Sequence, residues 1–172
     1  MGKVALQLKP EEQARLRKLS PDLELDHWGI DEAGRAVLLL NAAASMSADD
    51  YGRVVLQCYE FGDSREQQSW LRALSILPRC ERFLSTAIDA SRTNIIPLFE
   101  AIACENPYPA RYFPELNFNQ MVLKCMFNQI ALRRIVGLES RLNQELSRMA
   151  THYAAERKAA GREVPPDIGM VM

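Results

Sequence analysis

Apolar residues recur every three or four positions through most of the chain, which is the spacing of one face of an α-helix. Residues that start and stop helices divide this pattern into segments of ordinary helical length. The expected helices cover residues 10–19, 31–44, 47–61, 64–76, 78–92, 93–106 and 115–129, with a last long helix that ends at 160 and begins at 132 or 139. No stretch alternates apolar and polar residues between paired turn signals, so the pattern predicts no β-sheet.

Short links between these segments imply that successive helices lie antiparallel. We therefore expect an all-α fold of about seven to nine helices, built either as an antiparallel helical bundle or as a short HEAT-like α-solenoid without a clear sequence repeat. The length of 172 residues fits one domain over 1–172. Within it we expect N-terminal helices over 1–30 and an extended tail over 161–172, because Gly161 ends the last helix and two prolines follow at 165–166.

Several capping residues support these boundaries. Ser47 precedes a helical segment and belongs to the preferred N-cap residues. Ser64 and Gln67 have the spacing of a capping box, in which two side chains bond reciprocally to the first turn of a helix. Ser20 followed by Pro21 predicts a further helix start near the N-terminus.

Composition is that of an ordinary globular protein, with 48% apolar and 25% charged residues and a net charge of −1. A protein that binds nucleic acid through its phosphates needs a basic surface, which this balance does not provide. We therefore expect no nucleic-acid partner. The longest mainly apolar run, 36–44, is too short to span a bilayer, and the N-terminal residues are too polar for a secretory signal. These features predict a cytoplasmic protein.

The cysteines indicate separate thiols and no disulfide framework. Cys58, Cys80, Cys104 and Cys125 are 21 to 24 residues apart and form no CxxC motif. Each falls inside a segment that we expect to be helical. Reduced thiols packed among apolar neighbours are the expected state.

Side chains for metal or covalent chemistry are not clustered along the chain. His27 and His152 are the two histidines, and Glu24 stands three residues before His27. A di-iron bundle needs two such pairs and two further carboxylates, so this spacing alone predicts no metal site. The sequence also lacks a GxSxG elbow and the glycine-rich loops that bind nucleotide phosphates. We therefore expect no metal, no cofactor and no catalytic residue.

The least ordinary segment is the proline-rich stretch from Asn106 to Pro114. Its prolines restrict the backbone, and Tyr108 and Tyr112 offer flat amphipathic rings beside Arg111, which is suited to a carboxylate or phosphate. One interpretation is a rigid loop that binds a ligand or partner through these side chains. The other is a connection that tucks its aromatic rings into the core.

Two predicted helices carry polar residues in unexpected places. Asn119 lies within the apolar arc of the helix over 115–129, so its buried amide needs a partner, which is either a nearby protein group or a ligand. On the last helix, the expected core stripe is Leu138, Leu142, Leu146, Met149 and Tyr153. Beside that stripe runs a polar edge that forms either exposed ion pairs or one wall of a groove: Arg141, Glu145, Arg148, His152 and Glu156.

Three motifs stand in order in the second half of the chain: NPYPARYF at 106–113, NQMVLK at 119–124 and ERKAAGR at 156–162. With shorter segments at 78–79, 89–94, 98–103, 134–138, 143 and 163–166, they resemble the EboA domain family. The resemblance covers roughly residues 70–167, whereas the first 65 residues resemble no family and the last six depart from the family ending.

This resemblance implies a bacterial gene cluster, also found in some algae, that encodes a prenyltransferase-like membrane protein and several enzyme-like proteins. In cyanobacteria the cluster is linked to moving a secondary-metabolite precursor of the scytonemin pathway toward the periplasm. The resemblance carries over no catalytic residue. It implies partners among the other cluster-encoded proteins, including a position peripheral to a membrane enzyme, or a small hydrophobic metabolite.

Three functions follow as hypotheses. The first is a non-catalytic helical accessory protein that binds a partner protein or a small hydrophobic precursor and assists its trafficking. The second is a cryptic enzyme acting on a prenylated or phosphorylated intermediate. The third is a homo-oligomeric scaffold, such as a homodimer, because the apolar run Val37 to Leu40 fits either a core or an interface. The candidate contact residues are Asn106, Tyr108, Arg111, Tyr112, Asn119, Arg134 and Arg141.

Overall fold

The computed structural model describes residues 4–19 and 22–172, and these ranges contain nine α-helices and no strand. The expected all-α fold of seven to nine helices is confirmed. The α-helices are α1 Pro10–Leu19, α2 Ile30–Ser45, α3 Ala48–Glu60, α4 Ser64–Ala73, α5 Leu84–Ser91, α6 Ile96–Ala103, α7 Tyr108–Tyr112, α8 Glu115–Phe127 and α9 Gln144–Ala159. Short 3-10 helices lie between or after them: η1 Leu74–Ile76, η2 Cys80–Phe83, η3 Leu132–Arg134, η4 Glu139–Arg141 and η5 Ile168–Met170. The helix start expected at Ser20 and Pro21 lies outside the described residues.

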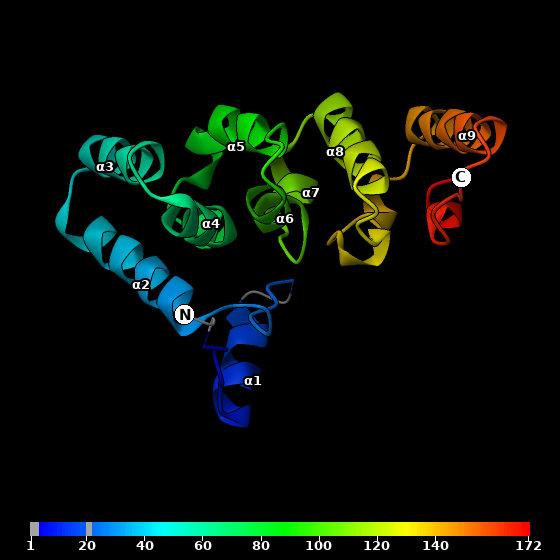
Figure 1. Ribbon diagram of the computed structural model, residues 1–172. Helices are drawn as coiled ribbons and strands as arrows, with labels where there is room; N and C mark the ends of the chain where they lie inside the picture. Colours follow the sequence, from blue (N-terminus) through cyan, green and yellow to red (C-terminus); the bar gives the residue numbers. More distant parts are fainter. Residues whose placement is uncertain (1–3, 20–21) are drawn as a thin grey trace.

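The helices pack mainly against neighbours that are close in chain order. Helix α4 lies between α2 and α6, and α6 also contacts α5, α7 and α8, while α9 packs on α8. Figure 1 shows α2, α4 and α6 along one side of the molecule and α3, α5, α8 and α9 along the other. This stacked order is typical of a short solenoid. Within the described ranges, no helix is long and apolar enough to cross a bilayer.

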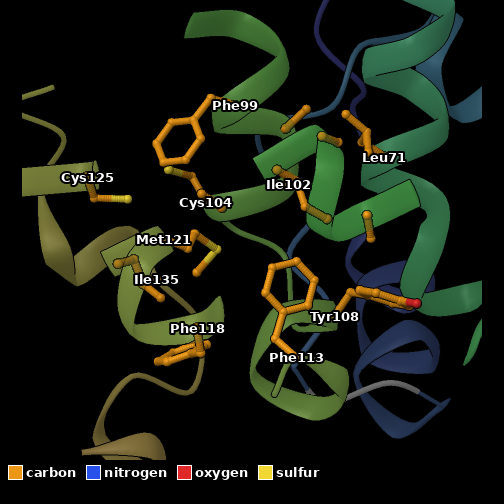
Figure 2. Close-up of a cluster of buried hydrophobic side chains, with 14 of the residues drawn as sticks. Leu71, Phe99, Ile102, Cys104, Tyr108, Phe113, Phe118, Met121, Cys125 and Ile135 are labelled. Carbon is orange, nitrogen blue, oxygen red and sulfur yellow. The ribbon is translucent and has the colours of Figure 1, made fainter. Parts of the chain in front are cut away.

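The core is centred on α6. Its buried residues, Leu98, Phe99, Ala101, Ile102 and Ala103, cover about 200° of its circumference, whereas Ile96 and Pro97 are exposed. A helix with so wide a buried arc must be covered by several neighbours, and a helix of eight residues is not stable alone in water. Figure 2 shows Phe99 and Ile102 between side chains of α4 and α8. The position of α6 therefore determines where the surrounding helices lie.

Two predicted helix starts can be compared directly with the structure. Ser47 caps α3 as expected, because its side chain accepts a hydrogen bond from the backbone N–H of Asp50. The prediction of a capping box at Ser64 is wrong, because the capping box of α4 begins one residue earlier, at Asp63. Asp63 caps α4 by accepting from the N–H of Glu66, and the Glu66 carboxylate accepts in return from the N–H of Asp63. A carboxylate at this position also interacts favourably with the positive end of the helix dipole.

The second half of the chain has shorter helices than expected. The segment expected to be one helix from residue 78 is divided into η2 and α5, and the long helix expected from 132 or 139 begins only at Gln144. Arg79 and Gly137 have φ values of 53° and 75°, which no right-handed helix accommodates. The expected core stripe is therefore only partly correct, because Leu142 precedes α9 and is 47% exposed, whereas Leu146 is fully buried.

The tail also differs from the extended segment expected over 161–172. After α9 the chain folds back and forms η5, with Ile168 and Val171 buried in the core. The Asp167 carboxylate accepts a hydrogen bond of 2.5 Å from the N–H of Leu132. The apolar residues near the C-terminus therefore complete the core beside η3.

Replacement of Gly137 by alanine tests the turn that shortens α9. The new Cβ would stand 2.7 Å from the Cβ of Ala110, at a φ that disfavours any side chain. We expect Gly137→Ala to lower the free energy of unfolding by about 1–3 kcal/mol in a urea titration. Gly161 has a φ of +64° but open space around it, so we expect Gly161→Ala to lower the free energy of unfolding by about 1 kcal/mol. Gly34 lies within α2 and also has open space around it, so Gly34→Ala should raise the free energy of unfolding by about 0.5 kcal/mol. Equal losses for Gly137→Ala and Gly161→Ala would show that close packing at Ala110 is unimportant.

Candidate functional site

The stretch from Asn106 to Pro114 folds inward and joins three helices. The buried Asn106 amide donates hydrogen bonds to the carbonyl oxygens of Leu71 (2.9 Å) and Ala101 (3.0 Å). Its side-chain oxygen accepts from the N–H of Tyr108 at 3.0 Å. One asparagine therefore connects the C-terminal parts of α4 and α6 with the start of α7, and its polar atoms face protein groups.

Tyr108 is completely buried in this arrangement. Its hydroxyl donates to the carbonyl oxygen of Cys80 at 2.9 Å, and burial raises the pKa of the phenol. Its ring lies 4.7 Å from the Tyr112 ring and 6.3 Å from the Phe113 ring, measured between centroids. Figure 2 shows Tyr108 and Phe113 within the buried cluster. Tyr108 thus packs as part of the core and offers no surface to a ligand.

Arg111 and Tyr112 are the members of this stretch that reach the surface. The Arg111 guanidinium forms an ion pair of 2.9 Å with Asp22, which ties α7 to the N-terminal segment. Tyr112 is half-buried, and a hydrogen bond with the Cys80 thiol raises the pKa of its phenol. An exposed ion pair of this kind contributes little stability and can open without unfolding the chain.

Asn119 finds its partner inside the protein. Its amide donates to the side-chain oxygen of Asn143 at 3.1 Å and accepts from the Asn143 amide at 3.0 Å. The same Asn143 oxygen accepts from the N–H of Leu146 at 2.8 Å and thereby caps α9. The reciprocal amide pair therefore fixes the start of α9 against α8.

The two candidate arginines also bond to protein groups. Arg134 forms a bidentate pair with Glu105, at 2.6 and 3.0 Å, and a 2.5 Å bond with Glu100. The bond with Glu105 raises the pKa of the guanidinium. Arg141 donates to the carbonyl oxygens of Ala110 (2.6 Å) and Phe113 (2.7 Å), at the end of α7. Both arginines thus hold turns in place.

The structure does not bring the seven candidate residues together around one cavity. They lie at separate helix junctions, where most of their polar atoms bond to backbone or to neighbouring side chains. Arg134 lines a recess of about 700 Å³, together with charged side chains of both signs. Among the described residues, no three His, Cys, Asp or Glu side chains are grouped so that they could hold a metal ion.

A different feature, which the sequence analysis did not assign as a site, is an open groove of about 320 Å³ where α2, α3 and α4 meet. We call it the α2–α4 groove. Its volume is at the lower end of the range of small-molecule sites. Leu38 and Phe61 stand at its rim with 69% and 83% of their surface exposed. The lining residues are Arg35, Leu38, Leu39, Gln57, Cys58, Phe61, Gly62, Glu66 and Trp70.

The floor of the α2–α4 groove is held in position by Trp70. This indole is 1% exposed, and its N–H donates to the carbonyl oxygen of Val55 on α3 at 2.8 Å. Its ring lies against Tyr59 (4.7 Å) and Phe83 (5.4 Å). The floor is therefore preformed and apolar, because the one polar atom of the indole is already bonded.

One signal in the sequence did point toward this groove. Four apolar residues in a row, Val37 to Leu40, turn through about 300° of a helix and cannot all face one core. The structure leaves Val37 and Leu38 exposed and half-buries Leu39 and Leu40. The concave shape depends on the angle between α2 and α3 where both pack on α4, and this angle cannot be predicted from helical periodicity.

Removal of the Asn143 side chain tests the amide pair. Asn143→Ala leaves the buried Asn119 amide unpaired, which costs about 1–3 kcal/mol of stability. It also removes the N-cap of α9, which costs about 1 kcal/mol. We expect the free energy of unfolding to fall by about 2–4 kcal/mol in chemical denaturation. Ser47→Ala, which removes only the cap of α3, is the matched control and should cost about 1 kcal/mol. Losses of equal size in the two variants would mean that the pair contributes no stability.

Comparison with known proteins places the whole chain in one family. No curated protein and no solved structure matches it. A family model described as "Metabolite traffic protein EboA" matches residues 1–172, and this match extends the similarity from the motifs at 70–167 to the N-terminal helices that form the α2–α4 groove. The chain therefore belongs to the EboA family of metabolite traffic proteins.

Proposed function

We propose that this chain is a non-catalytic accessory protein of metabolite traffic and that it binds a small hydrophobic metabolite in the α2–α4 groove. The observation that supports this is an open apolar groove whose rim exposes Leu38 and Phe61 above the buried Trp70. The family description fits a trafficking role. A groove that is open to solvent suits a carrier, because a ligand can enter and leave without unfolding of the helices.

The energetic reason for binding is the apolar surface at the rim. Exposed Leu38 lies on α2, exposed Phe61 directly follows α3, and both line the same groove, so one ligand can cover both. Burial of apolar surface contributes about 25 cal/mol per Å², and an apolar ligand also loses its own contact with water. Because Trp70 is already fixed, little ordering of the protein opposes this gain.

The residues first considered as contacts have other roles in this proposal. Asn106, Tyr108, Asn119, Arg134 and Arg141 position the helices through the hydrogen bonds described above. Contact with another protein of the same traffic system is proposed for the exposed part of α7, at Arg111 and Tyr112. No residue is assigned a catalytic step. We propose that the protein and this partner meet in the cytoplasm.

Replacement of Leu38 tests the groove. Leu38→Asp places a charge at the rim, and the high exposure of this position leaves the core intact. We expect the affinity for the neutral fluorescent probe N-phenyl-1-naphthylamine to fall about tenfold or more. The matched control is Leu116→Asp on α8, where the leucine is 60% exposed but outside the groove. Equal affinities in the two variants would remove the groove as the binding site. A change in oligomeric state with Leu38→Asp alone, seen by light scattering, would instead indicate that a second copy covers this surface.

The exposed thiol of Cys58 offers an independent test. Cys58 lines the groove, whereas Cys80, Cys104 and Cys125 are buried. A hydrogen bond with Cys104 and burial also raise the pKa of the Cys125 thiol, which slows its reaction further. We expect 4,4′-dithiodipyridine, an uncharged thiol reagent, to modify one thiol rapidly in the folded protein and saturating N-phenyl-1-naphthylamine to slow this reaction. Cys58→Ser should remove the rapid phase. A rate that does not change with the probe would contradict binding at the groove.

A further inference from the structure

We infer that the α2–α4 groove selects uncharged ligands and rejects anionic ones such as fatty acids or diphosphates. This inference rests on the proposed function of the groove and adds the chemical class of its ligand. It follows from the polar groups around the groove, whose bonding capacity is already used within the protein. Each of these groups is considered in turn.

Arg35 is the cation that lines the groove, and it already forms an ion pair with Asp31 on the same helix, α2. Its guanidinium forms an ion pair of 2.9 Å with Asp31 and lies 3.4 Å from the Ser69 hydroxyl. The hydrogen bond with Arg35 lowers the pKa of Asp31, so this carboxyl stays ionised at neutral pH. An anionic ligand must therefore compete with a carboxylate that is already bound to Arg35.

The other charges at the rim oppose an anion. Glu66 lines the groove and accepts a hydrogen bond of 2.8 Å from the N–H of Asp63, as part of the capping box of α4. The Asp63 carboxylate, which caps the same helix, adds a second negative charge beside it. The hydrogen bond from the N–H of Glu66 lowers the pKa of Asp63. Arg35 and Arg65 lie close enough to lower this pKa further, so charges of both signs balance one another here. Arg35, the cation in the groove lining, is therefore already paired and offers an anion no unused positive charge.

A cationic ligand gains little from these carboxylates, because they are held in place by Arg35 and by backbone N–H groups. The polar group of the floor is committed as well, since the Trp70 indole bonds to Val55. What remains free for a ligand is the apolar surface of Leu38, Leu39 and Phe61, with the uncharged Gln57 side chain at the rim. A charged head group placed in this setting loses water without gaining a partner, and that loss is costly.

Two probes that share one ring system test the inference. N-phenyl-1-naphthylamine is neutral, whereas 8-anilinonaphthalene-1-sulfonate carries a sulfonate on the same scaffold. We expect the neutral probe to bind the full chain at least about tenfold more tightly than the anionic one, and Leu38→Asp to weaken the neutral probe. Equal or tighter binding of the anionic probe overturns the inference while the proposed function stands. Failure of both probes to bind overturns the proposed function, and this inference with it.

A pair of charge-neutralising variants identifies the cause of the selectivity. Asp31→Asn removes the charge that occupies Arg35, so we expect the anionic probe to bind several-fold more tightly and the neutral probe to bind as before. The matched control is Glu145→Gln, which removes a carboxylate from the equivalent first turn of α9, where it pairs with Arg148 far from the groove lining. An anionic-probe affinity that responds equally to the two variants, or to neither, would show that Arg35 is not held back by Asp31 and would overturn the argument.

Discussion

The arrangement of the helices depends on the burial of α6 over more than half of its circumference. This helix has eight residues, and five of them are almost completely inaccessible to water. Neither its length nor its backbone hydrogen bonds stabilise it in isolation, so its stability comes from the helices that cover it. α4, α5, α7 and α8 provide this cover. The outer elements, including α2, α3 and α9, then pack on helices that α6 has already positioned.

Much of the fold follows from the sequence, because helical periodicity and capping are local properties. The positions of α2, α3, α4 and α8 agree with the pattern to within a few residues. One error is local, because Asp63 and Ser64 are both preferred N-cap residues, and the other depends on a non-local contact. Asp63 caps α4 in place of Ser64, and the turn at Gly137 prevents the apolar residues at 138 and 142 from joining the last helix. A left-handed backbone conformation can be stabilised by packing on a distant residue such as Ala110, which periodicity does not record.

The candidate site was harder to predict, because a polar or aromatic residue in a motif has the same appearance whether it binds a ligand or holds a junction. The motifs that carry the family resemblance place Asn106, Tyr108 and Asn119 at contacts between helices. The groove is built instead from residues that look ordinary in the sequence, such as Leu38, Cys58 and Phe61. Its existence depends on the angle between two helices, and that angle is a property of the packed structure.

Figure 1 shows α2 and α3 at one end of the helical stack, so the groove that they form with α4 lies at that end. Its rim residues are exposed, whereas the residues around α6 are not. Substitutions at the rim therefore leave the folding core unchanged. Under the proposed function, a terminal location of this kind would let the preference for a cargo change over evolutionary time while the scaffold persists.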